Sequence, residues 1–272
     1  MNLKRLFLLG DIGLFNLNLN SIIHSVQSSI SPNDIIVLLG DNFYPNGVHS
    51  EEDNQILKFQ NSFENISNPI YSILGNHDYL QNPQAQINNS NWIMPDFYYK
   101  KEYNNVDLYF LDTVQFNTHS CLSKELIENV HNNSINNIVN KQLIWLHNEM
   151  EKNKHKQKIV FGHYPIISNG LYKNHVIYNY YYLINLLRKY NVKAYISGHE
   201  HNIQHLTRII DNYKLNQIII GSTAECRNDN DYSEYPDMCD KFDNYFGKLT
   251  IDDTSKIEYI NKNNITKYVY NL

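Results

Sequence analysis

Five times in this sequence, an apolar run is followed by glycine and then by a side chain that can bind a metal ion. These five side chains are Asp11, Asp41, Asn76, His163 and His199. Glycine lets the backbone turn sharply where a buried strand ends. In open α/β sheets, binding sites form outside the carboxyl ends of the strands, where several loops converge. One polar residue after a strand is usually structural, but five in one chain predict strand ends that share a site.

Strand-like and helix-like segments alternate along the first two thirds of the chain. Apolar runs predict strands at 4–9, 35–39, 69–74, 106–111, 158–161 and 193–196, with 97–101 forming a hairpin with 106–111. Helical spacing predicts helices at 18–30, 51–64, 139–152 and 180–190. Beyond residue 202 the pattern predicts only strands, at 203–210, 216–220, 245–251, 256–260 and 266–270. Without a linker or repeat, we expect one mixed α/β domain over residues 1–272.

Charge and composition argue against several classes of protein. The net charge of −5 argues against general binding to nucleic acid or to anionic membranes. No apolar run approaches the ~18 residues of a membrane span. The apolar run at 6–9 is too short for a signal peptide and ends at Asp11. We therefore expect an intracellular, cytoplasmic protein, and a monomer. Cys226 and Cys239 could close a loop, but free thiols are expected without an export signal.

Two more residues complete the candidate ligand set. Tyr44 follows Asp41 by three residues, and His201 follows His199 by two. Mixed oxygen and imidazole ligands suit a pair of Fe, Mn or Zn ions better than a thiolate zinc site. Two such ions ~3.5–4 Å apart can clamp a phosphoryl oxygen and lower the pKa of a bound water. A bridging carboxylate is the natural way to hold two cations that close.

The order and spacing of these motifs resemble those of the calcineurin-like metallophosphoesterases. The matching stretches are Asp11, Gly40-Asp41-Asn42, Gly75-Asn76-His77-Asp78, Gly162-His163 and Gly198-His199-x-His201. Many members carry a histidine two residues after the first Asp, where this chain has Gly13, and Tyr44 is present instead. That exchange is typical of the purple acid phosphatases, and nearly the whole chain resembles their small, tartrate-resistant type. The resemblance implies a four-layer αββα sandwich of two mixed β-sheets flanked by helices.

The resemblance also implies a role for each ligand. A ferric ion would be held by Asp11, Asp41, Tyr44 and His201. A divalent Fe, Zn or Mn ion would be held by Asp41, Asn76, His163 and His199, with Asp41 bridging the two ions. Residue chemistry agrees with this division, because anionic ligands suit the higher charge and neutral ligands the lower one.

Residues beside the ligands are candidates for proton transfer and support. We assign His77 to the phosphate oxygens or to protonation of the leaving group, with Asp78 orienting it; the alternative is a packed histidine. Asp112 and Asn202 are candidates for support behind the ligands. Tyr164 is expected in the wall of the site or in the core.

The chain departs from the purple acid phosphatases at three places. In the small mammalian enzymes, the loop after the fourth motif carries a histidine that assists the leaving group. Here the loop 169–175 has only His175, which is displaced, with Tyr172 or Lys173 nearer that place. Glu200 stands where relatives often have Asp. Residues 225–241 are acidic where relatives have a basic loop, and an acidic rim would disfavour polyanionic substrates.

The resulting hypothesis is an acid phosphatase that hydrolyses small-molecule or phosphoprotein phosphate monoesters. The resemblance implies in-line attack of a metal-bound hydroxide at a dinuclear Fe(III)–M(II) centre. Two alternatives stay open: a di-Mn or di-Zn phosphodiesterase of the same superfamily, and a metal-binding protein without turnover. Monoester and diester model substrates, tested with added metals, separate these three.

Overall fold

The structure is a computed structural model of the 272-residue chain. It describes residues 2–116, 122–172, 180–227, 238–240, 243–252 and 254–272. The described strands form two sheets, one of six strands and one of seven. The side chain of Cys239 lies outside the described part of the chain. The prediction that Cys226 and Cys239 are free thiols, and the alternative of a disulfide between them, therefore fall outside it too.

The six-stranded sheet combines both ends of the chain. Its strands are β1 (Arg5–Leu9), β2 (Ile35–Leu38), β3 (Ile70–Ser72), β11 (Tyr245–Thr250), β12 (Lys256–Asn261) and β13 (Thr266–Asn271), in the order β13-β12-β11-β1-β2-β3. β1, β2 and β3 are parallel, and the other pairs are antiparallel. Right-handed crossovers between parallel neighbours place α1 (Leu17–Ser29) and α2 (Asn54–Phe63) on one face, where they contact each other.

The seven-stranded sheet follows the same logic in the second half of the chain. Its strands are β4 (Tyr99–Glu102), β5 (Val106–Phe110), β6 (Gln157–Phe161), β7 (Ala194–Ser197), β8 (Ile203–Ile210), β9 (Tyr213–Ile220) and β10 (Met238–Asp240), in the order β10-β8-β9-β7-β6-β5-β4. β5, β6, β7 and β9 are parallel. The crossover helices are α3 (Lys124–His131), α4 (Ile135–Lys152) and α5 (Tyr180–Lys189). α4 contacts α5, and α5 contacts β9.

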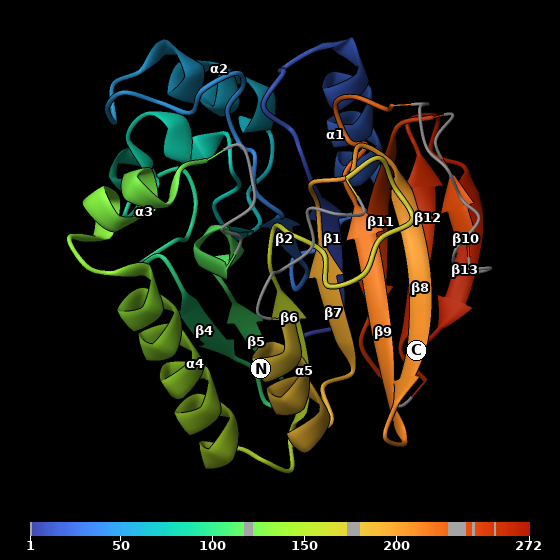
Figure 1. The fold of residues 1–272 in the computed structure, drawn as a ribbon. Coiled ribbons are helices and arrows are strands. Elements are labelled where there is room, and N and C mark those ends of the chain that lie inside the picture. The colour runs from blue at the N-terminus through green and yellow to red at the C-terminus, as the bar shows by residue number, and fades with distance from the viewer. Residues whose placement is uncertain (1, 117–121, 173–179, 228–237, 241–242, 253) are drawn as a thin grey trace.

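Figure 1 shows the two sheets overlapping face to face, with β4, β5, β6, β7, β9 and β8 running from left to right. β1, β11 and β12 overlap β7, β9 and β8 in this view, and β11 contacts β9. Helix α4 lies at the lower left and helix α5 at the lower centre. This confirms the predicted mixed α/β fold with helices flanking two mixed sheets. Among the described residues there are also three 3-10 helices: η1 (Asp78–Leu80), η2 (Pro83–Gln86) and η3 (Thr113–Phe116).

The structure corrects the prediction between residues 122 and 152. Helix α3 was not predicted, although Ser123 caps its first turn by accepting from Leu126 N at 3.1 Å. Helix α4 begins at Ile135, four residues before the predicted start. The helical spacing of 139–152 predicts that Leu143, Ile144, Leu146 and Met150 face inward; the last two are buried and Leu143 is partly buried.

Ile144 is 60% exposed, so its predicted burial is wrong. A polar side chain of this helix, Gln142, is buried instead. Its amide oxygen accepts from Asp112 N and its amide nitrogen donates to Asp112 O, both at 3.0 Å. A polar residue faces the core here because it satisfies both backbone groups of a strand end that no sheet partner reaches.

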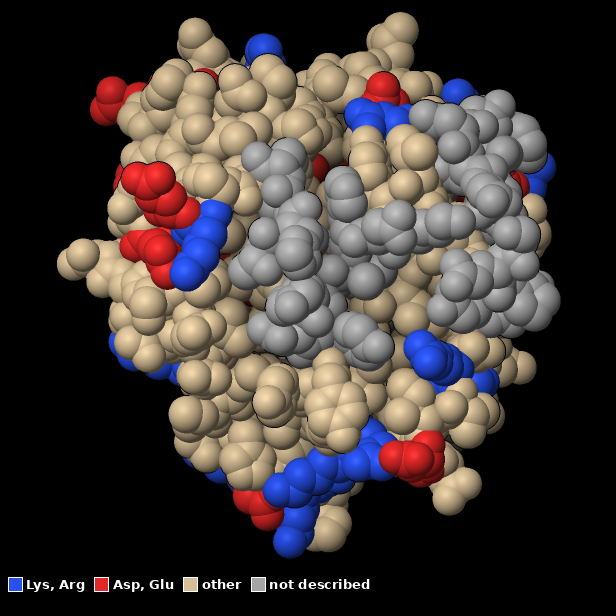
Figure 2. Space-filling model, in the orientation of Figure 1, with Lys and Arg blue, Asp and Glu red and all other residues tan. Residues whose placement is uncertain are grey.

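Charged residues are scattered over the face shown in Figure 2. The coloured Lys and Arg residues form small groups, several of them beside Asp or Glu. Within the described residues, no helix combines the length and the apolar character that a transmembrane span needs.

Candidate metal centre

The carboxyl ends of β1, β2 and β3 meet those of β6 and β7 at one place, and the predicted ligands follow these ends. Two contacts, one between backbone atoms and one from a side chain to the backbone, fix the meeting point. Asp11 N donates to Gly40 O at 3.1 Å, which joins the loops after β1 and β2. His163 Nδ1 lies 2.9 Å from Leu39 O, which joins the seven-stranded sheet to the six-stranded one. The stacking of the sheets therefore brings together residues that are 150 or more positions apart, such as Asp11 and His163.

One group of side chains surrounds the hydroxyl of Tyr44. This hydroxyl lies 3.1 Å from Asp11 Oδ1, Asp41 Oδ2 and His201 Nε2. His201 Nε2 is 3.7 Å from Asp11 Oδ1. A neutral phenol has one proton to donate, so three acceptors around it leave lone pairs facing one another. A cation of high charge fits that donor set.

A second group surrounds the side-chain oxygen of Asn76. Asn76 Oδ1 lies 3.0 Å from His163 Nε2 and 3.1 Å from His199 Nδ1. His163 gives its Nδ1 proton to Leu39 O, so its Nε2 carries a lone pair that faces an amide oxygen. The lone pairs of His163 Nε2 and Asn76 Oδ1 therefore face each other, which suits a cation bound between them. The ligands of this second group are mostly neutral.

Asp41 is common to both groups. Its Oδ2 contacts the Tyr44 hydroxyl, and its Oδ1 lies 3.5 Å from His163 Nε2. Ligand atoms of Asp11, Asp41 and His163 all lie within 4.8 Å of one another. The structure thus brings together the seven predicted ligands as two groups with one shared carboxylate. Their assignment to particular metal ions stays a prediction.

Burial makes this cluster costly unless positive charge compensates it. Burial raises the pKa of the Asp11 carboxyl well above its ordinary value, and the Asp41 carboxylate raises it further. Burial, with the charges of both aspartates, also raises the pKa of the Tyr44 phenol. Burial lowers the pKa of His163, and lowers that of His201 to about 4, where the Arg227 charge adds to the effect. A bound cation would favour the carboxylates, the phenolate and neutral imidazoles.

Three of the predicted ligands have left-handed backbone conformations. The φ angles are 58° at Asp11, 52° at Asp41 and 68° at His199. Such conformations are uncommon for residues other than glycine and concentrate at functional sites. Hydrogen bonds hold them: Asp11 Oδ2 accepts from His199 N at 2.9 Å, and Asp41 Oδ1 accepts from His77 N at 2.8 Å.

The exchange of histidine for Gly13 has a steric reason. A Cβ atom on Gly13 would lie 2.5 Å from Tyr44 N and 2.8 Å from Phe43 Cα. Gly13 O accepts from Tyr44 N at 3.2 Å. The loop that carries the tyrosine therefore occupies the space in which a side chain at position 13 would begin, so the two differences belong together.

Replacing Gly13 by Ala is expected to lower the free energy of unfolding by about 2 kcal/mol, because the new methyl group must displace the Tyr44 backbone. Denaturant unfolding of the metal-free protein measures this. Gly247→Ala is the matched control, since its Cβ would meet only side-chain carbons, at 3.1 Å or more. Equal stability of Gly13→Ala and the wild type would contradict the steric argument.

His77 lies at the edge of the cluster. Its Nδ1 is 2.5 Å from Pro45 O, and its ring packs edge-on against Tyr44 with centroids 4.6 Å apart. Its Nε2 is 4.0 Å from Asp41 Oδ2, and one third of the side chain is exposed. Because Nδ1 donates to Pro45 O, Nε2 remains available to a ligand that enters from solvent.

The prediction that Asp78 orients His77 is wrong, since Pro45 O does so. Asp78 is fully buried, and its carboxylate accepts from Gly75 N at 2.8 Å, Gln86 Nε2 at 3.0 Å and Asn42 N at 3.1 Å. Burial, followed by the charge of Asp41, raises the pKa of Asp78 to about 7. Asp78 therefore ties the loop after β3 to the loop after β2.

The candidates for support behind the ligands do not hydrogen-bond to any predicted ligand in the described part of the chain. Asp112 accepts from the Tyr79 hydroxyl and from Gln115 Nε2. Asn202 Oδ1 accepts from Gln204 Nε2 at 2.8 Å. Both side chains are buried and stabilise neighbouring loops instead. His175 lies outside the described residues.

The wall of the site includes residues that the motifs do not contain. The ring of Tyr164 is buried, with its centroid 4.4 Å from that of His199, as expected for a wall residue. Glu225 contacts His201 directly, and the Arg227 side chain pairs with Glu225. Most of the acidic stretch predicted at 225–241 lies outside the described residues; at its described beginning, Arg227 places a cation beside Glu225. No sequence signal distinguished these two residues from an ordinary charged loop.

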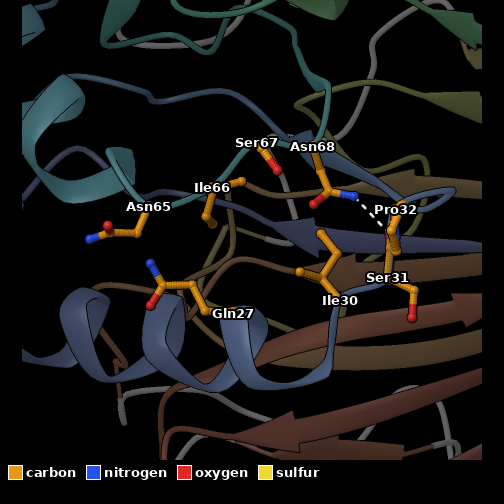
Figure 3. Close-up of a pocket in the computed structure, with 8 residues that line it drawn as sticks. All are labelled: Gln27, Ile30, Ser31, Pro32, Asn65, Ile66, Ser67 and Asn68. Atoms are coloured by element: carbon orange, nitrogen blue, oxygen red, sulfur yellow. Dashed lines mark hydrogen bonds between the residues drawn. The ribbon is translucent and has the colours of Figure 1, made fainter.

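A separate pocket lies away from this cluster and contains none of the predicted site residues. It has a volume of 280 Å³ and lies between the end of α1 and the loop after α2. Figure 3 shows Asn68 reaching Ser31, where its Nδ2 donates to the backbone oxygen at 2.8 Å. Gln27 and Asn65 line it with amides. Its lining combines amides, two serine hydroxyls and apolar side chains, and includes no charged or imidazole group.

A family model described as "Calcineurin-like phosphoesterase" matches residues 4–202, which include every predicted ligand. The chain belongs to the calcineurin-like phosphoesterase family. Among its relatives is tartrate-resistant acid phosphatase type 5 of Rattus norvegicus, which is 34% identical over 217 residues. That match covers 70% of this chain and 61% of the rat protein, so the chain spans less than two thirds of the length of this relative.

Two solved structures show the same phosphoesterase fold. One is described as "GAP50 the anchor in the inner membrane complex of Plasmodium", with a TM-score of 0.76, 22% identity, and coverage of 99% of this chain and 88% of that one. The other is a purple acid phosphatase from yellow lupin (Lupinus luteus) seeds, with a TM-score of 0.71, 15% identity, and coverage of 99% and 53%. At these identities the likeness concerns the fold alone.

Proposed function

We propose that this phosphoesterase-family chain hydrolyses phosphate monoesters with a pair of metal ions, one ferric and one divalent Fe, Zn or Mn. One observation carries the proposal. The two oxygens of Asp41 face two different ligand groups, one around the Tyr44 hydroxyl and one around Asn76 Oδ1. The names of the relatives support the phosphatase activity.

The residues divide the work by their chemistry. When bound, the metal pair supplies Lewis acidity towards the phosphoryl oxygens and an activated water. Asp41 and Asn76 keep the two ligand groups at a fixed distance from each other, because the two residues belong to neighbouring loops joined by Asp78. His77 presents Nε2 to the solvent side, where it binds a phosphoryl oxygen or donates a proton to the leaving oxygen.

Tyr44→Phe tests the ferric assignment. We expect iron-loaded wild-type protein to absorb visible light through a tyrosinate-to-iron transition, and the variant to lose that band. Tyr98→Phe is the control, because Tyr98 packs against Trp145 with ring centroids 4.9 Å apart, away from the cluster. The measurement is a visible spectrum together with iron analysis. An unchanged band in Tyr44→Phe would refute this ligand, and an iron-loaded wild type without the band would refute the ferric site.

The substrate class is tested separately from the metal. A phosphate monoester and a diester with the same leaving group are assayed with iron, zinc or manganese loaded protein. Faster monoester hydrolysis supports the proposal. A preference for the diester with zinc or manganese supports the phosphodiesterase alternative. Metal binding without hydrolysis of either substrate supports a protein that has lost turnover.

A further inference from the structure

His199 and His201, which follow β7, are each contacted on the side away from the other ligands by a residue that belongs to no motif. The ring of Tyr172 packs on the ring of His199, with centroids 5.0 Å apart. Glu225 Oε2 lies 3.0 Å from His201 Nδ1. Arg227 joins these two contacts: its Nη1 donates to the Tyr172 hydroxyl at 2.6 Å, and its Nε and Nη2 donate to Glu225 Oε2 at 3.2 and 3.0 Å.

We propose that Glu225 is a positioning residue for His201, and that Arg227 and Tyr172 hold it in place as one strut across the outer side of the metal centre. We call the three residues Tyr172, Arg227 and Glu225 the strut. The inference rests on the proposed metal centre. It adds a support that the phosphoesterase motifs do not contain.

The contact of Glu225 with His201 decides which ring nitrogen binds metal. His201 Nδ1 is buried and has no aligned hydrogen bond in the described part of the chain. A carboxylate oxygen at 3.0 Å would repel a second lone pair, so Nδ1 carries the proton. Nε2, which is 3.1 Å from the Tyr44 hydroxyl, then keeps its lone pair for the metal. A carboxylate behind a ligating histidine fixes the ring and raises its basicity.

The strut is tied to the same loop that it supports. Arg227 N donates to His201 O at 2.8 Å. At the other end, Glu200 Oε2 accepts from Tyr172 N at 3.3 Å, and Glu200 Oε1 accepts from the Ser168 hydroxyl at 2.7 Å. A Cβ on Gly170 would lie 2.0 Å from Glu200 Oε2, so only glycine lets this loop pack on the buried carboxylate. Glu200 therefore places the ring of Tyr172.

Arg227 also balances the charge that Glu225 brings to the site. Its guanidinium uses three of its five N–H groups within the strut, and the side chain is 37% exposed. A lone carboxylate beside Asp11 and Asp41 would add to their repulsion. Because arginine pairs with it, the Glu225 carboxylate can lie against the protonated Nδ1 of His201 at a lower electrostatic cost.

Zinc affinity of the metal-free protein tests the strut without using catalysis. Competition with a chromophoric chelator measures binding of Zn²⁺ to the wild type and to Glu225→Ala, Glu225→Gln and Arg227→Ala. We expect Glu225→Ala to weaken one of two zinc sites by about 10- to 100-fold and to leave the other nearly unchanged. Glu225→Gln should fall between that variant and the wild type, because its amide oxygen still presents a partial negative charge to the Nδ1 proton. Arg227→Ala should weaken the same site less.

Asp211→Asn is the matched control, since Asp211 also pairs with an arginine, Arg188, at the surface. Melting of each metal-free variant checks the fold, and the half-exposed positions of Glu225 and Arg227 make unfolding unexpected. A Glu225→Ala variant with wild-type zinc affinity would overturn the strut alone. Arg227→Ala with unchanged zinc affinity but a raised KM would overturn it too, in favour of a substrate contact. A wild type that binds no zinc would instead overturn the metal centre.

Discussion

Replacing Asp41 by Asn is expected to lower monoester hydrolysis by about a thousandfold. The variant keeps the shape of the side chain but loses the negative charge that both ligand groups share. A bound metal pair supplies several kcal/mol of transition-state stabilisation, and a loss of about 4 kcal/mol corresponds to about three powers of ten in rate. Elemental analysis should show fewer than two metals per chain, and steady-state kinetics should show the loss chiefly in kcat.

Asp34→Asn is the control for this experiment. Asp34 is also a buried carboxylate, but it pairs with Arg5 at the opposite end of β2. Its replacement should lower stability while metal content per folded chain stays at the wild-type level. An Asp41→Asn protein with two metals and wild-type kcat would remove the central carboxylate from the proposed function.

Replacing Asp78 by Ala is expected to lower the free energy of unfolding by about 4 kcal/mol, because buried donors on two loops lose their acceptor. The donors are Gly75 N, Asn42 N, Phe43 N and Gln86 Nε2. Denaturant unfolding of the metal-free protein measures the change. The expected result distinguishes a residue that shapes the loops from one that acts on substrate.

Glu51→Ala, at an exposed carboxylate, should leave stability within about 0.5 kcal/mol of the wild type. If Asp78→Ala were as stable as the wild type but inactive, Asp78 would be a catalytic residue, and the role drawn from its hydrogen bonds would be wrong.

Much of the fold follows from local pattern. The strand predicted at 203–210 has those bounds in the structure, and the apolar runs before Asp11 and Asp41 form β1 and β2. Strands of this kind are visible in a sequence because a strand buried on both faces needs a continuous apolar run. Helix α3 was missed because it has only eight residues and buries only Ile127 completely, so the apolar pattern repeats over too few turns to stand out.

Polar residues were predicted less well than apolar ones. Gln142 faces the core, and Asp78 serves the backbone rather than His77. Neither role has a local signature, because each depends on donors and acceptors that belong to other elements. The same holds for Glu225, whose contact with His201 joins loops that follow different strands.

The sequence by itself determined which side chains could bind metal and that each lies after a strand, since chain-local spacing sets both. It also paired Gly13 with Tyr44, for which the structure supplied the steric reason. Only the tertiary structure decided how these side chains face one another. Stacking two sheets brings Leu39 O to His163 Nδ1 and places both oxygens of Asp41 between two ligand groups. Such contacts span long stretches of chain, and their geometry depends on how the whole core packs.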